Sequence, residues 1–234
     1  MELIRLNKYL AQQGVASRRA VDAMLAEGRI SVNGKVVVGM GMKVDPDKDK
    51  ILVDGNPVQG SDRMVYIVLN KPEGTVVSSK KTEQAKNIVL DLVKVPERVF
   101  PVGRLDKETS GLLILTNDGD LALKLTHPSF ECEKEYEVTV HGTITPAIIH
   151  KLEQGVKLWG VRTNPATVTP LGHNRMRIVI TEGKNRQIRR ICQKLGISVK
   201  TLKRLRVKQL TLGALSVKQW RYLKPEEVEA LKSK

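Results

Sequence analysis

The sequence predicts an α+β protein of two domains. Some stretches place apolar residues at helical spacing and others form short β-branched runs, without the strict strand–helix alternation of a doubly wound fold. A polar, glycine-containing stretch at residues 59–63 is the best candidate for a linker. We therefore expect a small domain over residues 1–60 and a larger one over residues 61–234.

The sequence predicts two helices followed by a β-hairpin in residues 1–60. Apolar residues at helical spacing over residues 3–10 predict a first helix, which Gly14 would end. Ser17 can cap a second helix that ends at Gly28. The dipeptide Asn33-Gly34 lies between two short β-branched runs, and it predicts a tight hairpin because both central residues of such a turn need positive φ.

The sequence of the larger domain predicts strands and helices in mixed order. A buried strand over residues 65–69 opens it, and residues 75–101 show no regular pattern. The other expected elements are strands over 112–115, 136–140 and 177–181, a short helix ending near 128, a helix over 146–154 and a basic helix over 185–195.

The charge of the chain predicts a polyanionic partner. Forty Lys and Arg residues oppose twenty-five Asp and Glu, which gives a formal charge of +15. Nucleic acid fits this excess, because each phosphate contact releases condensed counterions. An anionic membrane is the weaker alternative, since the chain has no run of eighteen apolar residues and no amphipathic helix rich in Trp or Phe.

The sequence predicts no metal and no cofactor. Cys132 and Cys192 lack zinc spacing and a CxxC motif, so we expect reduced thiols in a cytoplasmic protein. The acidic segment 45–49 resembles a calcium loop but has Lys50 at the sixth position, where such a loop needs glycine. Neither a Walker loop nor a GxGxxG motif follows a strand.

Basic residues concentrate in two regions. Those of the small domain include Lys8, Arg18, Arg19, Arg29 and Lys35. Between Gly183 and Pro225 the chain has thirteen Lys and Arg and no Asp or Glu; this run contains Lys184, Arg186 and Arg190. A solvated charged face is the alternative explanation, but such a face normally mixes signs. We expect both regions to contact RNA.

Arg189 lies on the apolar side of the predicted basic helix. It would project about 100° away from Arg186 and Arg190, beside Ile188 and Cys192. Arginine among apolar positions is usually paired with a carboxylate, because its charge cannot be lost on burial. The pattern therefore predicts an acidic partner for Arg189.

The best candidate for that partner is Asp106. It lies in the polar segment GRLDKETSG, residues 103–111, directly before the apolar strand at 112. Polar loops held against a core strand commonly carry active-site residues. The alternative is that Asp106 only caps a turn, as many loop aspartates do.

Two family resemblances bear on these residues. The segment RLNKYLAQQGVASRRAVDAMLAEGRISVNGKVV resembles the S4-like RNA-binding domain, which implies binding of structured RNA through its shape and phosphates. The segments GRLDKETSGLLILTNDGDLALKLTHPS, EKEYEVTV and TEGKNRQIRRICQKLG resemble the three signature segments of pseudouridine synthases, in particular the ribosomal group that contains the RsuA and RluB enzymes. Together the resemblances cover essentially the whole chain.

The second resemblance implies a fold and a reaction. The larger domain would be a mixed, mainly antiparallel β-sheet with flanking helices. It would isomerise a uridine of ribosomal RNA to pseudouridine, without a cofactor or a small-molecule cosubstrate, after the target uridine has flipped out of the structured RNA.

The resemblance also implies roles for individual residues. Asp106 would act on the ribose to break its bond to uracil, either as a nucleophile or by removing a ribose proton. Tyr136 would pack on the flipped base and is a candidate for deprotonating carbon 5, and Arg189 would pair with the aspartate. Arg104 joins the expected RNA contacts. Lys184 departs from the arginine often found there, which puts a bidentate phosphate contact in doubt.

Alternatives to this hypothesis are a non-catalytic ribosomal RNA-binding protein, which explains the charge equally well, and an enzyme that acts on transfer RNA. The C-terminal segment TLKRLRVKQLTLGALSVKQWRYL is closer to large-subunit enzymes, so 23S rRNA is favoured over 16S rRNA. A monomer is the expected state for a protein that binds one large RNA.

Overall fold

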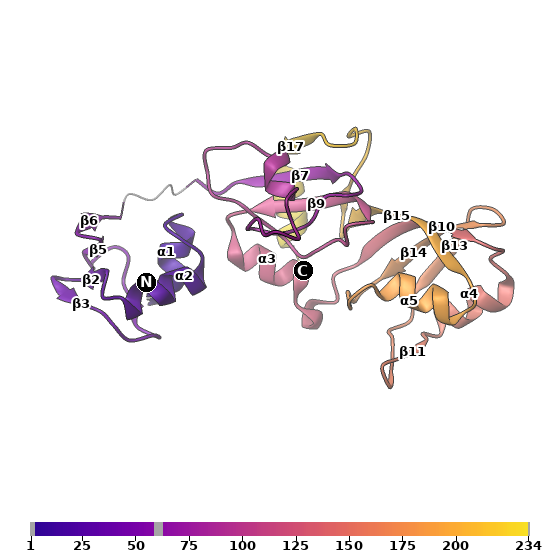
Figure 1. Cartoon of the computed structure of the whole chain (residues 1–234), viewed down its shortest axis with the longest axis horizontal. Coiled ribbons are helices and arrows are strands. Elements are labelled where there is room, and N and C mark those ends of the chain that lie inside the picture. Colours follow the sequence, from indigo (N-terminus) through magenta and orange to yellow (C-terminus); the bar gives the residue numbers. More distant parts are fainter. Residues whose placement is uncertain (1–2, 59–62, 234) are drawn as a thin grey trace. The chain divides into compact units, whose positions relative to one another are not determined.

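The computed structural model describes residues 3–58 and 63–233, and it divides into two compact units (Figure 1). Unit 1 comprises Met1–Val65 with Pro96–Arg98, and unit 2 comprises Tyr66–Val95 with Val99–Lys234. The expected linker at 59–63 lies outside the described residues except for Arg63. Within the described part of the chain, no helix has the length and hydropathy needed to cross a membrane.

Unit 1 contains two helices and two small sheets. Its elements are β1 (Ile4–Arg5), α1 (Leu6–Gln12), α2 (Arg18–Ala26), β2 (Ile30–Val32), β3 (Lys35–Val36), β4 (Lys43–Val44), β5 (Ile51–Val53) and β6 (Asn56–Pro57). β1 pairs with β4, and the other strands form a sheet in the order β3-β2-β5-β6. The apolar faces of α1 and α2 close over these strands to form one core.

Local sequence signals explain most of unit 1. The Oγ of Ser17 accepts a hydrogen bond from the backbone N–H of Ala20 at 3.2 Å, which confirms the predicted cap of α2. Asn33 and Gly34 have φ of 51° and 81°, which confirms the predicted hairpin turn. The first helix begins at Leu6, later than predicted, because the two residues before it pair with β4.

Unit 2 is built on one large sheet. Its elements are β7 (Tyr66–Lys71), the 3₁₀ turn η1 (Val89–Leu92), β8 (Phe100–Pro101), β9 (Ser110–Thr116), α3 (Gly119–Thr126), η2 (Pro128–Phe130), β10 (Lys134–His141), α4 (Pro146–Glu153), β11 (Lys157–Leu158), β12 (Val161–Arg162), β13 (Thr167–Pro170), β14 (Arg175–Ile180), α5 (Gln187–Lys194), β15 (Ser198–Val207), β16 (Leu210–Thr211), β17 (Trp220–Tyr222) and α6 (Pro225–Lys232).

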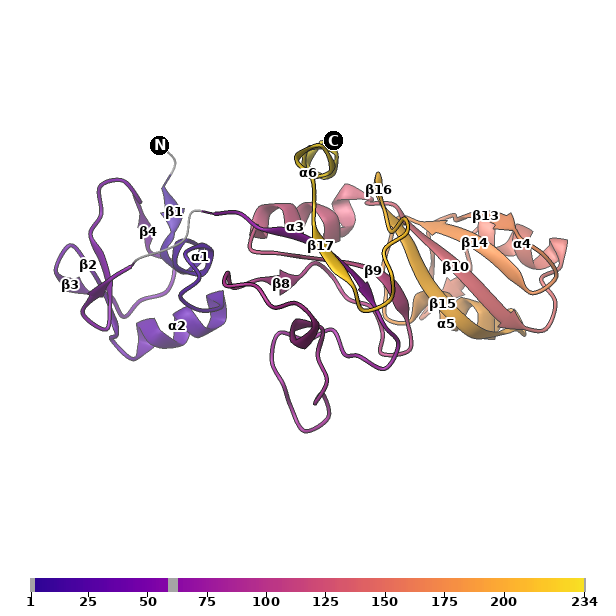
Figure 2. The same ribbon diagram turned by 90° about the horizontal axis from the view of Figure 1, so that it is seen from above.

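The sheet is mixed and mainly antiparallel, as predicted. Its nine described strands follow the order β13-β14-β10-β15-β9-β7-β17, with β16 on β15 and β8 on β9. Only β15 and β9 pair in parallel. Helices flank the sheet: α3 packs with α6, α5 with β15 and α4 with β13 (Figure 2).

One prediction about the basic C-terminal region needs correction, and one strand of this region was not predicted. The basic helix begins at Gln187 and not at residue 185, because Arg186 adopts a left-handed conformation with φ of 49°. The region beyond it contains the longest strand of the sheet, β15, where Leu202, Arg204 and Val207 are buried. The basic residues at 200, 203, 204 and 206 do not follow a two-residue period, so the sequence did not indicate this strand.

The two halves of the sheet meet where β9 approaches β15. Arg204 pairs with Gly111, and Arg204 Nε donates to the carbonyl oxygen of Leu112 at 2.7 Å. A Cβ atom on Gly111, which has φ of +102°, would lie 2.2 Å from the Arg204 carbonyl oxygen. Only glycine permits this approach, so the position fixes how the segment before β9 enters the sheet.

We expect Gly111→Ala to lower the free energy of unfolding by at least about 3 kcal/mol, because it adds both a steric clash and a strained φ. Urea denaturation measures the change. Gly119→Ala is the matched control, since a Cβ there meets no atom within 4 Å and φ is not positive. Equal stability of the two variants would contradict this account of the β9–β15 contact.

Candidate active site

A cavity of about 270 Å³ lies in unit 2, and it brings together segments that are far apart in the sequence. Its walls come from the segment before β9, from Tyr136 on β10, from Leu202 on β15 and from residues 183–188, which lead into α5. Asp106 and Tyr136 both line it. Two of the three predicted catalytic residues thus share one cavity.

Asp106 is half-buried in the cavity wall. No hydrogen bond or ion pair to its carboxylate is found among the residues that the structure describes. Its backbone carbonyl accepts the N–H of Thr109 at 3.0 Å, so the segment turns at this point. The backbone of Asp106 therefore forms the turn, and its carboxylate is not used in it. An aspartate that caps a turn would instead accept a backbone N–H with its carboxylate.

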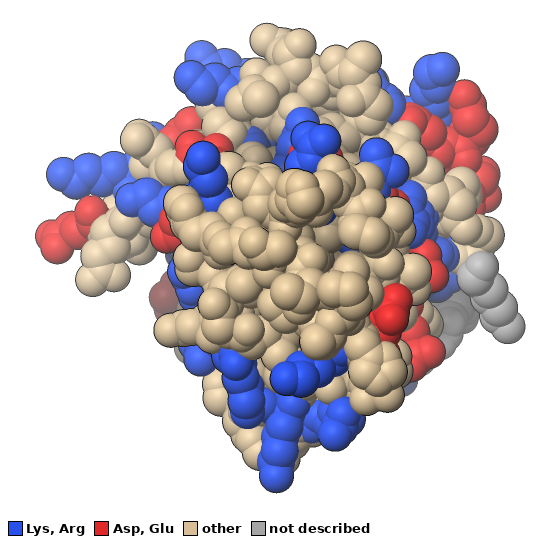
Figure 3. Space-filling view, turned by 90° about the vertical axis from the view of Figure 1, so that its right-hand side faces the viewer, with Lys and Arg blue, Asp and Glu red and all other residues tan. Residues whose placement is uncertain are grey.

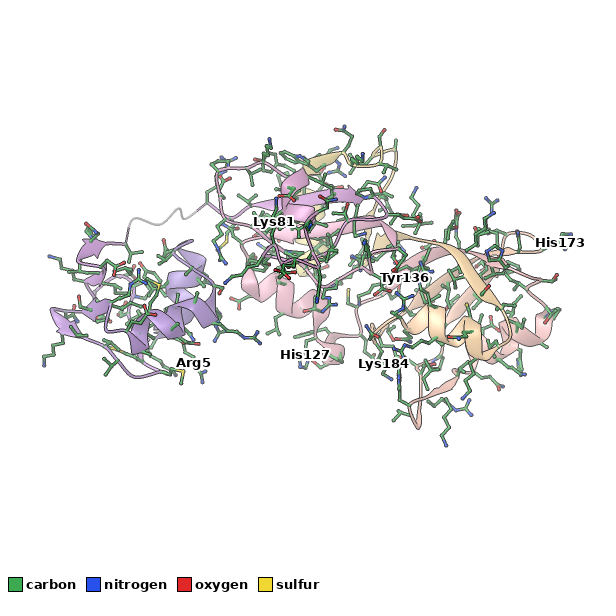
Figure 4. The ribbon with its side chains drawn as sticks, in the orientation of Figure 1. Arg5, Lys81, His127, Tyr136, His173 and Lys184 are labelled. Carbon is green, nitrogen blue, oxygen red and sulfur yellow. The ribbon has the colours of Figure 1, made fainter. Side chains whose placement is uncertain are left out.

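Tyr136 separates two cavities. It is 8% exposed, and β10 holds it between Ile178 of β14 and Arg204 of β15. A second cavity of about 230 Å³ lies beyond the tyrosine and shares Arg104, Tyr136, Gly183 and Lys184 with the first. His127 and Lys184, which Figure 4 labels below Tyr136, also line the second cavity.

The predicted ion pair between Arg189 and Asp106 is wrong for this structure. Arg189 Nη2 donates to the carbonyl oxygen of Glu108 at 2.7 Å, and Nη1 donates to that of Val199 at 3.5 Å. Its Nε is buried without a hydrogen-bond partner among the described residues. The helix pattern correctly placed Arg189 against the polar segment, but a backbone carbonyl takes the place of the carboxylate.

Arg186 lines the first cavity in place of Arg189. Its Nη1 forms an ion pair with Glu108 Oε2 at 2.8 Å, and this contact lowers the pKa of Glu108 and raises that of Arg186. The charge of Asp106 further raises the pKa of Arg186. A positive side chain and the carboxylate of Asp106 therefore line the same cavity.

The other predicted RNA contacts of unit 2 have different surroundings. Arg104 is exposed on the wall that both cavities share. Lys184 also lines both, and its Nζ pairs with Glu182 at 2.9 Å. Arg190 lies outside both cavities, where its guanidinium stacks 4.9 Å from the ring centre of Trp159. In Figure 3, basic side chains surround a mainly uncharged centre at the end of this unit.

The predicted RNA contacts of unit 1 also differ in availability. Arg18 and Arg19 are exposed in the first turn of α2, where the helix dipole favours an anion. Lys35 is exposed on β3, and Lys8 is half-buried on α1. Arg29 forms ion pairs with Asp54 at 2.7 Å and Glu27 at 3.2 Å, so its charge is already compensated.

Lys71 is a residue of the site that the sequence did not indicate. It is fully buried at the end of β7, and its Nζ donates to the carbonyl oxygens of Thr109 at 2.7 Å and Pro72 at 2.9 Å. Its longer contact to the carbonyl oxygen of Lys107 is 3.4 Å. The ammonium thus holds the segment that carries Asp106. A lysine before Pro72 looked like part of an ordinary turn.

The described residues contain no cluster of three or more His, Cys, Asp or Glu that could hold a metal ion. The acidic segment 45–49 forms its own turn: Asp49 accepts hydrogen bonds from Asn33 at 2.8 Å and from the N–H of Asp45 at 2.7 Å. Cys132 and Cys192 are free and buried, and burial raises the pKa of the Cys192 thiol to about 12.

Comparison with known proteins gives this cavity its context. Residues 65–194 match the family model of RNA pseudouridylate synthase, and residues 4–49 match that of the S4 domain. The chain belongs to the RNA pseudouridylate synthase family. It is therefore an enzyme that isomerises uridine in RNA, and the non-catalytic alternative is set aside.

Relatives resemble the chain over nearly its whole length. Ribosomal large subunit pseudouridine synthase B of Bacillus subtilis is 40% identical over 236 residues, covering 98% of this chain and 96% of that protein. Dual-specificity RNA pseudouridine synthase RluF of Escherichia coli K12 is 39% identical, covering 96% and 77%. A crystal structure of a pseudouridylate synthase matches with a TM-score of 0.72 and 26% identity, covering 97% and 99%.

Lys71 makes stability depend on pH. Burial lowers the pKa of Lys71 to about 8, so the folded protein loses this proton near pH 8, whereas the unfolded chain keeps it to about pH 10.4. Between these values unfolding takes up a proton. The group destabilises the fold below pH 8, and its contribution to the free energy of unfolding rises with pH above it, by up to about 1.4 kcal/mol per pH unit.

Lys71→Met should remove this contribution. We expect the stability difference between wild type and Lys71→Met to shift in favour of wild type from pH 8 to pH 10, measured by urea denaturation at half-unit intervals. Subtracting the stability curve of Lys71→Met from that of wild type removes the contributions of the titrating groups that the two proteins share. Parallel curves for the two proteins would show that Lys71 keeps an ordinary pKa in the fold.

Proposed function

We propose that this enzyme converts one uridine of ribosomal RNA to pseudouridine, in 23S rRNA rather than 16S rRNA, with Asp106 as the catalytic residue. The observation that carries the proposal is the carboxylate of Asp106, which has no hydrogen-bond or ion-pair partner among the described residues and lines the same cavity as Tyr136. Carboxylates in folded proteins normally find hydrogen-bond partners, so one left free in a cleft of an enzyme is best explained by its chemistry.

The reaction needs one bond broken and one formed. The bond between ribose carbon 1 and uracil nitrogen 1 breaks, the base turns within the cavity, and carbon 5 bonds to carbon 1. Carbon 5 loses a proton and nitrogen 1 gains one, so the product is an isomer and no cosubstrate is consumed. Asp106 supports the first step, either by attack on the ribose or by removal of a ribose proton.

The dimensions of the cavity suit a single base. Its volume of about 270 Å³ is near the lower end of the roughly 300–1,000 Å³ typical of small-ligand sites. A uridine must therefore leave the RNA stack to enter, which costs a few kcal/mol. Stacking on Tyr136 can offset about 1–3 kcal/mol of that cost. The phenolic oxygen of Tyr136 is the candidate base that would deprotonate carbon 5 late in the reaction.

We assign the arginines two kinds of role. Arg189 is a positioning residue, because it holds the backbone of Glu108 two residues from Asp106. Arg104 and Arg186 place positive charge on the cavity walls, where they would meet the phosphates that flank the flipped uridine. With the exposed Arg18, Arg19 and Lys35 of the S4 domain, they would hold structured RNA.

Ribosomal RNA is supported by the large-subunit enzyme of Bacillus subtilis, which matches the chain from end to end. Transfer RNA is the second candidate substrate for this enzyme, because the name of the dual-specificity relative of Escherichia coli implies more than one RNA substrate. We further propose that the enzyme acts as a monomer in the cytoplasm, where its buried thiols, Cys132 and Cys192, stay reduced.

Asp106→Asn should abolish turnover while RNA binding persists. The amide keeps the shape of the side chain but loses the charge that acts on the ribose. Tritium release from a 23S rRNA transcript labelled at uracil carbon 5 measures turnover, and we expect a loss of at least about 1,000-fold. Asp120→Asn, at the start of α3, is the charge-matched control and should react normally. Release by Asp106→Asn at the wild-type rate would refute the assignment.

Mapping pseudouridines in a strain that lacks this protein tests the substrate. We expect one position of 23S rRNA to remain uridine, and expression of wild type, but not of Asp106→Asn, to restore the modification. Pseudouridines are mapped in parallel in transfer RNA and 16S rRNA from the same cells. Loss of a pseudouridine from either of these, with 23S rRNA unchanged, would contradict the proposed substrate and favour the corresponding alternative.

A further inference from the structure

The second cavity is separate from the one that holds Asp106. Its volume is about 230 Å³, and the wall it shares with the first cavity includes Tyr136 and Arg104. Its remaining lining comes from residues 102–103 and β9, from α3 and the segment after it, from β10, from residues 181–182, and from Arg204 and Val207 of β15. Neither the proposed reaction nor the positioning of Asp106 uses this space.

Arg204 is the most unusual residue of this cavity. It is 4% exposed, and its Nε donates to the carbonyl oxygen of Leu112 at 2.7 Å. Arg204 lines the second cavity, and no hydrogen bond from either of its Nη atoms is found among the described residues. Four N–H donors of a buried guanidinium are therefore unused.

No described carboxylate compensates this charge. Lys134 adds a second cation to the same cavity, and its Nζ donates only to the carbonyl oxygen of Cys132 at 2.7 Å. Burial and the charge of Arg204 lower the pKa of Lys134. The one acidic residue of the lining, Glu182, is already bound by Lys184 at 2.9 Å and by Gln187 at 2.6 Å.

A buried guanidinium beside a half-buried ammonium, with no acid between them, is costly unless an anion joins them. A buried, unpaired charge destabilises a fold by several kcal/mol, and proteins normally pair it. The fork of N–H donors on a guanidinium matches a phosphate in geometry, and a lysine beside it adds a point charge. Apolar walls from Val102, Leu125 and Val207 lower the local dielectric and strengthen both contacts.

We infer that the second cavity binds a phosphate group of the RNA chain, that of a nucleotide next to the target uridine, between Arg204 and Lys134. The inference rests on the proposed site for the uridine in the first cavity. Because Tyr136 and Arg104 belong to both cavities, a base beside Tyr136 brings the adjoining phosphate to the second. The subsite would fix the register of the RNA strand, so that only one nucleotide can face Asp106.

Binding measurements in the Asp106→Asn protein test this subsite without turnover. We expect Lys134→Met and Arg204→Gln, each added to Asp106→Asn, to weaken binding of a 23S rRNA fragment by about tenfold, as for the loss of one charge-assisted hydrogen bond. Each should also reduce the slope of log K against log salt concentration by about 0.7. Lys151→Met, on the exposed face of α4, is the control and should change neither quantity.

Neutral linkages in the RNA locate the phosphate. Methylphosphonates are placed one at a time around the target uridine, and one linkage should weaken binding by the Asp106→Asn protein yet have no effect once Lys134→Met is added. This arm uses a folded protein even if Arg204→Gln does not fold, which thermal unfolding reveals. Inorganic phosphate is titrated alone to distinguish a free anion from an RNA phosphate.

The outcomes separate this inference from the proposed function. Unchanged affinity in Lys134→Met, or equal losses at every linkage, would overturn the subsite whatever the role of Asp106. Saturable binding of inorganic phosphate that Lys134→Met abolishes, with no sensitive linkage in the RNA, would overturn it in favour of a free anion. Normal tritium release by Asp106→Asn would refute the catalytic assignment but leave the phosphate measurement intact.

Discussion

The close approach of β9 to β15 at Gly111 and Arg204 is the constraint on which the catalytic unit depends. This parallel contact joins β13, β14 and β10 on one side of the sheet to β7 and β17 on the other. The segment that carries Asp106 enters the sheet at β9, and Tyr136 is held on β10 beside β15. The contact between β9 and β15 therefore brings Asp106 and Tyr136 to the same cavity. Arg204 is buried at the same junction.

Charge in unit 2 is distributed unevenly around this junction. Glu108, Glu182 and Glu135 are occupied by basic side chains. Asp106 and Arg204 form no ion pair with any described residue, and each lines a cavity of its own. Groups of opposite sign left unpaired at one junction suit an RNA substrate, which offers an electrophilic sugar carbon to the first and a phosphate to the second.

The sequence predicted best where a local signal decides the structure. The Ser17 cap and the Asn33-Gly34 turn depend on residues within a few positions, and both are confirmed. The mixed, mainly antiparallel sheet followed from the family resemblance, which also put Asp106 and Tyr136 at one site. The family resemblance indicates which residues far apart in the sequence lie close together in the fold. Hydrophobic periodicity alone cannot indicate this.

Where prediction failed, the missing information was three-dimensional. The helix pattern showed the direction of Arg189 but not its partner, which is the backbone of Glu108. Lys71 gave no signal, because its role depends on carbonyl groups of a segment more than thirty residues away. In β15 the irregular spacing of the basic residues gave no sign of a strand, and only the fold shows that Arg204 is buried while Lys203 and Leu205 are not.

A structure of the Asp106→Asn variant bound to a 23S rRNA fragment would test the central claim most directly. The account places one extruded uracil in the first cavity, with its ring on Tyr136 and its ribose facing residue 106. A complex in which every uridine of the bound RNA stays stacked, and the first cavity contains no base, would contradict it.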